Sequence, residues 1–470
     1  MMDRATTSCP NCEALERKIT ELIERIAALE NELAKAKKNS RNSSKPPSSD
    51  ITNPPKKRGG SGKKRGKRKR GGQHGHPRHE REPFDESQID HFFDYYYDSC
   101  PDCGGRVTLT DENPRITQQV DILPKPTIVS EHRGLGCWCE SCQKMHYAPV
   151  HEDIRRAGLV GPRLTALIAY LKGACHCSFS TIRKFLRDVV QIKISRSQLR
   201  NVCAKVSDSL DAAYEGLLAL LPEEGQVNVD ETGHKDNGQR MWTWCFRASL
   251  YTLFKIDSSR SSRVLIDVLG SEFNGVLGCD YFSAYRKYMG DFNVLVQFCL
   301  AHLIRDVKFL VEHPNTKNRS YGRRILKVIR AMFHLIHRRE TMDVKRFTRK
   351  LEEAGCELLR QATYHVPSTK EAKNLKRRFE KHGESYIQFI TTPGIDPTNN
   401  IAEQAIRFVV IDRRVTQGSR SEAGQRWLER IWTTIATCTQ QGRSVFEFLH
   451  ESVVAHFHGN QPPALVPDTS

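Results

Sequence analysis

The stretch QVNVDET, residues 226–232, alternates apolar and polar side chains and places Val227 and Val229 on one face of an expected β-strand. Asn237 and Gly238 follow it closely. An Asn-Gly pair is a strong hairpin signal, because both residues tolerate the positive φ angles of a two-residue turn. The sequence therefore predicts that this strand turns back into a second strand.

Two more strands, a helix and a short strand continue the pattern. They are RMWTWCFRA (240–248), YTLFKI (251–256), the helix SSRVLIDVLGSEF (261–273) and the short strand GVLGCD (275–280). A helical crossover between strands of one sheet makes them parallel and right-handed. We therefore expect an α/β fold in which the short strand lies beside QVNVDET.

This arrangement brings acidic residues together at one edge of the sheet. Asp230 and Asp280 lie at the carboxyl ends of the two parallel strands, and Mg²⁺ takes one or two carboxylates with water and substrate phosphate. Glu403, which follows the break at Pro397, is the candidate for a third carboxylate. Its other interpretation is a capping box with Asn400 as the N-cap, and the residue pattern alone favours the cap.

The positive charge of the chain is concentrated in one tract. The net charge is +18, and residues 37–78 hold fifteen Lys and Arg against one acid, Asp50. Few apolar side chains lie in the segment 39–82, so we expect it to be disordered in isolation. Dense cationic charge favours sequence-independent contact with nucleic-acid phosphates over a plain solvated linker.

Residues 13–36 are expected to form a helix with a heptad seam. The apolar positions are Ile19, Ile26 and Leu33 at a, and Leu15, Leu22 and Leu29 at d. The pattern favours a parallel two-stranded coiled coil over an amphipathic helix packed on its own chain. The CPNC pair at 9–12 fits a zinc site shared between two chains and a pair of free thiols equally well.

Two further C-x-x-C pairs, CPDC and CESC, have the spacing of a zinc ribbon. Cys100, Cys103, Cys139 and Cys142 would close a tetrahedral structural Zn²⁺ site, with His146 as a possible substitute ligand. An odd total of fifteen cysteines argues for a reducing compartment rather than a disulfide framework.

The segment 160–221 is expected to be helical and to contain a helix-turn-helix-like pair. Ser195 is a plausible N-cap for the second helix. A DNA-binding motif would point Arg196, Gln198 and Arg200 toward a groove. Three-helix packing without DNA is the other interpretation, and the pattern alone favours it slightly.

The order of these blocks resembles the transposases of the insertion sequence 66 family. The resemblance covers about residues 10–450 and rests on the heptad start, NSSKPPSSD, GGQHGHP, CPDC/CESC, VDET, CDYFSAY, CLAHLIRD, NNIAEQAIR and GSRSEAG. It implies an RNase H-like core with an acidic triad at Asp230, Asp280 and Glu403, and it assigns Glu403 to metal binding rather than capping.

The same resemblance concerns the segment between the last two carboxylates. The helical stretch 303–395 is similar to the insertion that many such cores carry. Cys299 and His302 match a C-x-x-H element of several transposase families, and a packed strand end explains them equally well. Gln404 stands where an Arg is expected and Thr398 where an acid or Asn is common. These departures concern DNA contacts near Glu403 and leave the triad complete.

The function implied by the resemblance is a DDE-type transposase that cuts the ends of a mobile element and joins them to target DNA. Two Mg²⁺ or Mn²⁺ ions would be held by the triad, and Arg407 is a possible phosphate contact. The expected partners are double-stranded DNA, a second copy in a homodimer or higher oligomer, and accessory proteins of the same element. Without a visible signal peptide or membrane span, we expect a cytoplasmic, nucleoid-associated bacterial protein.

Two alternative functions remain: a non-enzymatic zinc-ribbon DNA-binding protein, such as an inactive copy, and an RNase H-like nuclease without strand transfer. The expected organisation has six parts: coiled coil 1–38, basic linker 39–82, zinc ribbon 83–150, helix-turn-helix-like region 151–222, DDE domain 223–440 with its insertion, and tail 441–470.

Overall fold

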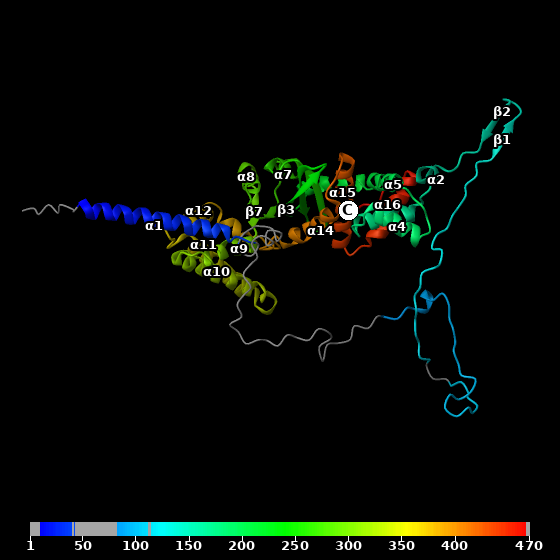
Figure 1. Ribbon diagram of the computed structural model, residues 1–470, viewed down its shortest axis with the longest axis horizontal. Helices are drawn as coiled ribbons and strands as arrows, with labels where there is room; N and C mark the ends of the chain where they lie inside the picture. The colour runs from blue at the N-terminus through cyan, green and yellow to red at the C-terminus, as the bar shows by residue number, and fades with distance from the viewer. Residues whose placement is uncertain (1–9, 40–41, 43–81, 111–113, 467–470) are drawn as a thin grey trace, which may run out of the picture. The chain divides into compact units, whose positions relative to one another are not determined.

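A computed structural model describes residues 10–39, 42, 82–110 and 114–466 of the chain (Figure 1). The chain divides into two compact units, one of residues 57–130 and one that combines residues 1–56 with 131–470. Most of the basic tract at 39–82 lies outside the described residues. The described part of the smaller unit is irregular apart from the 3₁₀ turn η2 (Glu86–Gln88).

A five-stranded mixed sheet forms the centre of the larger unit. Its strands are β3 (Gln226–Asp236), β4 (Gln239–Arg247), β5 (Thr252–Asp257), β6 (Val276–Cys279) and β7 (Leu295–Phe298). The spatial order is β5-β4-β3-β6-β7, with antiparallel pairing from β5 to β3 and parallel pairing from β3 to β7. The expected mixed α/β fold is therefore confirmed.

The structure confirms the turn, the crossover helix and the parallel pairing that the sequence predicted for this sheet. Asn237 and Gly238 have φ angles of 46° and 84°, so both adopt the left-handed conformation that the two-residue β3–β4 turn requires. Helix α7 (Ser262–Leu269) provides the crossover to β6. Val227 pairs with Leu277 across the parallel β3–β6 ladder. Strand β7, which follows α8 (Ser283–Phe292), is an addition to the four strands predicted from sequence.

Helix α15 (Glu422–Gln440) protects the outer edge of the sheet. Its side chains, spaced four residues apart, accept hydrogen bonds from alternate backbone N–H groups of β5. Glu429 accepts from Ile256 at 2.6 Å, Thr433 from Phe254 at 3.0 Å and Thr437 from Thr252 at 3.2 Å. Four helical residues rise about 6.0 Å and two strand residues about 6.6 Å, so the two repeats stay nearly in step. The contact removes an edge otherwise open to pairing.

Of the helices that directly precede the sheet, three build a second, smaller apolar core. The helices are α2 (Glu152–Ala157), α3 (Pro162–Gly173), α4 (Phe179–Asp188), α5 (Arg196–Ser209) and α6 (Asp211–Leu220). The smaller core is formed by α3, α4 and α5, whereas buried side chains of α2 and α6 join the main core around the sheet. Ser195 caps α5 as expected, and Gln198 completes the capping box, so the Gln198 amide is engaged in capping. Residues 441–470, expected as a tail, contain α16 (Val445–His458), which packs on α3 and α5.

The expected insertion is a group of helices between β7 and the helix that bears Glu403. It contains α9 (Leu300–Val311), α10 (Thr316–Ile336), α11 (Val344–Thr363), α12 (Lys370–His382) and α13 (Gln388–Thr391), and the 3₁₀ turns of the larger unit are η3 (Leu221–Glu223), η4 (Arg339–Thr341) and η5 (Glu384–Tyr386). Neighbouring helices α9 to α12 pack in sequence. Tyr321, Ile325 and Leu358 are fully or almost fully buried between them.

Helix α1 (Pro10–Ala36) forms over the expected heptads. Its apolar seam is about half exposed, with exposed fractions of 48–60% at Leu15, Ile19, Leu22, Ile26, Leu29 and Leu33. Near the end of α1, Asn31 lies 3.0 Å from His313 and Lys38 stacks over Phe309. The helix thus contacts its own chain at one end, while the seam has no partner within the described chain. None of the helices in the described part is long and apolar enough to cross a membrane.

Candidate active site

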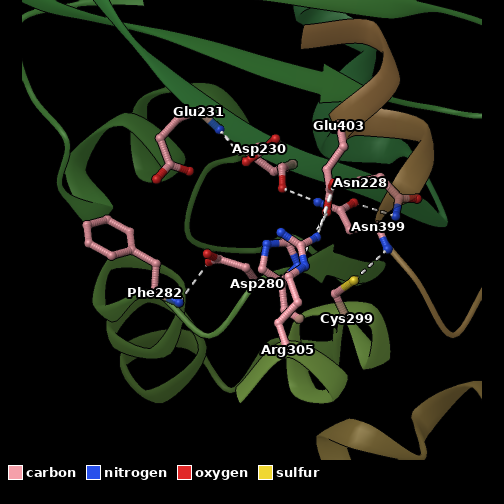
Figure 2. Close-up of polar contacts among 11 residues, drawn as sticks. Asn228, Asp230, Glu231, Asp280, Phe282, Cys299, Arg305, Asn399 and Glu403 are labelled. Carbon is pink, nitrogen blue, oxygen red and sulfur yellow. Dashed lines mark hydrogen bonds and ion pairs between the residues drawn. The ribbon is translucent and has the colours of Figure 1, made fainter. Parts of the chain in front are cut away.

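Three elements bring the three sequence-predicted carboxylates into one space, which Figure 2 shows. Asp230 lies on β3, and Asp280 follows the last residue of β6 directly. Glu403 lies in the first turn of α14 (Asn400–Thr416), which packs on β3 and β4. The parallel β3–β6 pair sets the first two residues side by side, and α14 carries the third to them.

Electrostatics show how closely these groups interact. Burial raises the pKa of Asp230 well above its usual range, and the charges of Glu231, Asp280 and Glu403 raise it further. Burial and Glu231 likewise raise the pKa of Asp280 to about 6, although the Phe282 N–H donates to it at 2.8 Å. Carboxylates that repel one another in a buried site create a negative field that a cation would neutralise.

Asn399 joins the start of α14 to the sheet (Figure 2). Its side-chain amide donates to the Val229 carbonyl at 2.8 Å and accepts from the Asn228 amide at 2.9 Å. Its backbone N–H donates to Cys299 Sγ at 3.2 Å. Asn399 is 1% exposed, so each of these bonds replaces water that the site excludes. These hydrogen bonds, which we call the Asn399 clamp, hold the start of α14 against β3 and so fix the position of Glu403.

A glycine makes room for this clamp. Gly278 of β6 pairs with Asn228 of β3, and a Cβ on Gly278 would lie 2.3 Å from the Asn228 amide nitrogen. That separation is shorter than any van der Waals contact allows, so a side chain at position 278 would displace Asn228. Gly278 therefore leaves room for Asn228, and Asn228 in turn donates to Asn399 at the start of α14.

The immediate partners of Glu403 test its interpretation as part of a capping box. Asn399, not Asn400, is the N-cap of α14, and it makes no side-chain capping bond. The Arg305 guanidinium instead donates to both Glu403 oxygens, at 3.1 and 3.3 Å. The predicted alternative of a capping box between Asn400 and Glu403 is therefore wrong, because the helix starts one residue earlier and the Glu403 side chain points into the site.

Cys299 and His302 also lie beside Glu403. Cys299 is almost fully buried at the end of β7, as the packed-strand interpretation expects. His302 Nδ1 lies 3.3 Å from Glu403 Oε1 without hydrogen-bond geometry. Burial, Arg305 and Arg378 lower the pKa of His302 to about 3, so its ring is neutral. The ligand atoms of Cys299, His302 and Glu403 all lie within 4.8 Å of one another, which a metal ion would also fit.

Sequence reasoning missed the partner groups around the triad. Glu231 has a 3% exposed side chain, receives hydrogen bonds from Arg260 at 2.7 and 2.9 Å, and accepts another from the Tyr285 hydroxyl. It directly follows Asp230 in VDET, but successive residues of a strand normally face opposite sides of the sheet, so the pattern gives no reason to place both near Asp280. Arg407 lies exposed one turn beyond Glu403.

The predicted zinc ligands form two separate knuckles. Cys139 ends β1 (Gly136–Cys139), and Cys142 lies in the turn to β2 (Lys144–Tyr147), 3.2 Å from His146 Nε2. Hydrogen bonds from Cys142 lower the pKa of Cys139, and the Asp102 and Cys103 backbone groups lower that of Cys100 in the same way. A lowered thiol pKa favours the thiolate that binds metal.

Cys100 and Cys103 belong to the unit of residues 57–130, whereas Cys139 and Cys142 belong to the larger unit. A site made by all four cysteines therefore stays a prediction.

Comparison with known proteins gives two family matches. A model described as "Transposase IS66 family" matches residues 157–426, which include the whole sheet and all three carboxylates. A second model, of a family of unknown function (DUF6444), matches residues 5–82, which include α1 and the basic tract. No curated protein matches the chain significantly.

Proposed function

Because the chain belongs to the IS66 family of transposases, we propose that it cuts the ends of a mobile element and joins them to target DNA. We propose Asp230, Asp280 and Glu403 as the residues that catalyse both steps. The observation that carries this proposal is the meeting of three carboxylates from β3, β6 and α14. Burial raises the pKa values of Asp230 and Asp280. The charges of Asp280 and Glu403 raise the pKa of Asp230 further, and the charge of Glu231 raises both. The strand order and the helical insertion support the assignment of this sheet to the RNase H-like class.

The donor set fits a divalent cation. All three proposed ligands are carboxylates, which Mg²⁺ and Mn²⁺ prefer over nitrogen or sulfur donors. When bound, one or two such ions would polarise the scissile phosphate and make water a stronger nucleophile. The Arg305 guanidinium now holds Glu403, so a cation at the triad would compete with Arg305 for that carboxylate.

The other residues of the site orient and shield these ligands. The Phe282 N–H fixes one oxygen of Asp280, and Asn399 holds α14 against β3. Arg407, exposed one turn from Glu403, is placed to contact a phosphate outside the triad.

In the proposed reaction, water attacks the phosphodiester at the element end and a 3′-hydroxyl leaves. That hydroxyl then attacks a target phosphodiester in line and displaces a second 3′-hydroxyl. Both steps proceed without a covalent protein intermediate.

The regions outside the core support the same proposal. The basic tract is suited to sequence-independent contact with phosphates. The half-exposed heptad seam of α1 is suited to a second copy of the chain, which would hold two element ends together. A structural Zn²⁺ at the four cysteines would stabilise the segment between the tract and the helical region.

The test is a cleavage and joining assay with a plasmid that carries the DNA flanking the gene. Purified wild type, Asp280→Asn and the control Asp267→Asn are incubated with Mg²⁺ or Mn²⁺. Asp267 lies on α7 and pairs only loosely with Arg263, at 3.7 Å. We expect cut and joined products from wild type and Asp267→Asn and none from Asp280→Asn.

Hydrolysis without joining would favour a nuclease. DNA binding with no products from wild type, with the element's other proteins added, would favour a non-enzymatic DNA-binding protein.

A further inference from the structure

A cationic cavity lies next to the proposed catalytic site. Its volume is about 630 Å³, and its lining includes Tyr281, the residue directly after Asp280. We call it the α12 groove, and its cations from α8 and α12 are Arg286, Lys370, Arg377, Arg378 and Lys381. Two lysines near the end of α1 add to them, against only two carboxylates, Asp306 and Glu371. The lining is thus strongly positive.

Most of these cations lack an acidic partner in the part of the chain that the structure describes. Arg378 pairs with Asp306 at 2.7 Å. Among the residues that the structure describes, Arg286, Arg377 and Lys381 form no ion pair, and neither does Lys370. A surface that gathers unpaired cations beside a reaction centre is suited to an anionic ligand.

Two arginines of the groove also keep an unused donor. The guanidinium carbons of Arg286 and Arg378 lie over the Tyr281 ring, 4.5 and 3.8 Å from its centroid. The Nε atom of each is buried and has no hydrogen-bond partner within the described chain. Buried donors in folded proteins normally find an acceptor. Phosphate oxygens match the planar guanidinium fork well, because they accept two parallel hydrogen bonds from it.

The spacing on α12 fits an extended ligand. Lys370, Arg377 and Lys381 lie seven and then four residues apart, which places them along one side of the helix. They extend over roughly 16 Å, at about 1.5 Å per residue. A DNA strand carries one phosphate per roughly 3.4 Å of duplex axis, so this row would follow about five phosphates.

We propose that the α12 groove binds the phosphate backbone of the DNA strand that enters the active site, without reading its base sequence. The inference rests on the proposed function, because it makes that DNA the substrate of the adjacent carboxylates. Arg286 and Arg378 hold the phosphate nearest Asp280, and the exposed cations of α12 hold the phosphates farther along. The insertion thereby acts as a DNA-positioning element.

The test measures binding of a labelled duplex by the full-length protein in EDTA, over a series of salt concentrations. The groove variant is Arg377→Ala/Lys381→Ala. The matched control is Lys345→Ala/Arg346→Ala on α11, which removes the same charge from exposed positions outside the groove. All four side chains are exposed, and circular dichroism checks that both variants keep the fold.

For the groove variant we expect the slope of log K against log salt to become shallower by about 1.8, since each lost phosphate contact changes it by about 0.9. Affinity near 0.1 M salt should fall roughly tenfold or more. The loss should be equal on element-end and unrelated duplexes. The charge-preserving variant Arg377→Lys/Lys381→Arg should bind like wild type, and the α11 control should keep the wild-type slope.

An unchanged slope in the groove variant, an equal loss in the α11 control, or a loss confined to the element-end duplex would overturn the inference. Binding in EDTA does not depend on strand cleavage. A wild type that cuts no DNA would therefore contradict the proposed function while leaving this result intact. A wild type that cuts DNA while the groove variant keeps its slope would contradict the groove alone.

Discussion

At the scale of single residues, the site consists of carboxyl groups whose ionised form is disfavoured by burial and by neighbouring negative charges. Asp280 is buried, and Glu231 next to Asp230 adds a further negative charge. A carboxyl group whose pKa is higher in the folded than in the unfolded chain binds more protons when folded, so the folded state loses relative stability as pH rises. A bound divalent cation would favour the ionised carboxylates and so offset this loss of stability.

In EDTA, we expect the stabilising contribution of protonated Asp280 to be complete below its unfolded pKa of about 3.9 and lost as pH rises through about 6. The loss amounts to roughly 2–3 kcal/mol for this group. Thermal unfolding at about pH 5 and about pH 8 should show that Mn²⁺ raises Tm more at the higher pH. Asp280→Asn should abolish most of this difference. Equal Mn²⁺ stabilisation of the variant would contradict the assignment.

The sequence allowed the triad to be named but not its surroundings. Asp280 was expected at a strand end and directly follows β6, whereas Asp230, expected at the end of its strand, lies inside β3, two residues beyond the parallel pairing with β6. Glu403 required a family resemblance because its local pattern also fits a helix cap. Arg305 lies 98 positions from Glu403 in the chain. No local periodicity indicates a contact between residues so far apart in the sequence. The same holds for Arg378, which reaches Tyr281 only because the insertion folds back toward β6.

At the scale of elements, the N-cap of α14 differs by one residue from the N-cap that the sequence pattern indicated. The pattern indicated Asn400, whereas the structure uses Asn399 as the N-cap and directs the Asn399 amide to β3. A cap is normally predicted from helical propensity and local hydrogen bonding. Here the contact with Asn228 and Val229 fixes where the helix begins, and both partners lie far away in sequence.

We expect Asn399→Ala to lower the free energy of unfolding by about 2–4 kcal/mol, because the Asn228 amide and the Val229 carbonyl lose buried partners worth about 1–3 kcal/mol each. Strand cleavage should fall as well, since α14 carries Glu403. Asn400→Ala is the matched control, because Asn400 is exposed. Denaturant unfolding of both variants checks the prediction. A larger effect at Asn400 would restore the capping interpretation.

Other elements were predictable to the extent that their signals are local. The Asn237-Gly238 turn, the crossover to β6 and the Ser195 cap all follow from neighbouring residues. Strand β7 is only four residues long and pairs with β6 alone. Helix α16 is held by α3 and α5, which lie far earlier in the sequence. Elements of this kind depend on tertiary packing that one sequence does not reveal.

At the scale of the whole molecule, the chain combines the proposed catalytic sheet with segments suited to DNA and to a second copy. The transposase family match over residues 157–426 covers the sheet and the three carboxylates, and the separate match over residues 5–82 covers α1 and the basic tract. The four predicted zinc ligands are divided between the two compact units. The four-cysteine zinc site therefore stays a prediction.

Metal analysis of the purified protein tests this zinc site. We expect about one zinc per chain from the four-cysteine site under reducing, chelator-free conditions. Cys139→Ser/Cys142→Ser should lose this zinc. Cys137→Ser should keep it, because Cys137 is an exposed neighbour on the same strand that the ribbon pattern leaves out. A wild type without zinc, or a Cys137→Ser variant that loses it, would contradict the assignment.

Iron-mediated cleavage of the full-length protein tests most directly whether Asp230, Asp280 and Glu403 hold one divalent-cation site. Fe²⁺ is added in place of Mg²⁺, ascorbate and peroxide generate radicals at the bound ion, and mass spectrometry maps the cuts. We expect cuts near all three carboxylates in wild type, protection by excess Mg²⁺, and loss of all three cuts in Asp280→Asn. Wild-type cuts confined to the cysteine knuckles, or cuts that persist unchanged in Asp280→Asn, would contradict such a site.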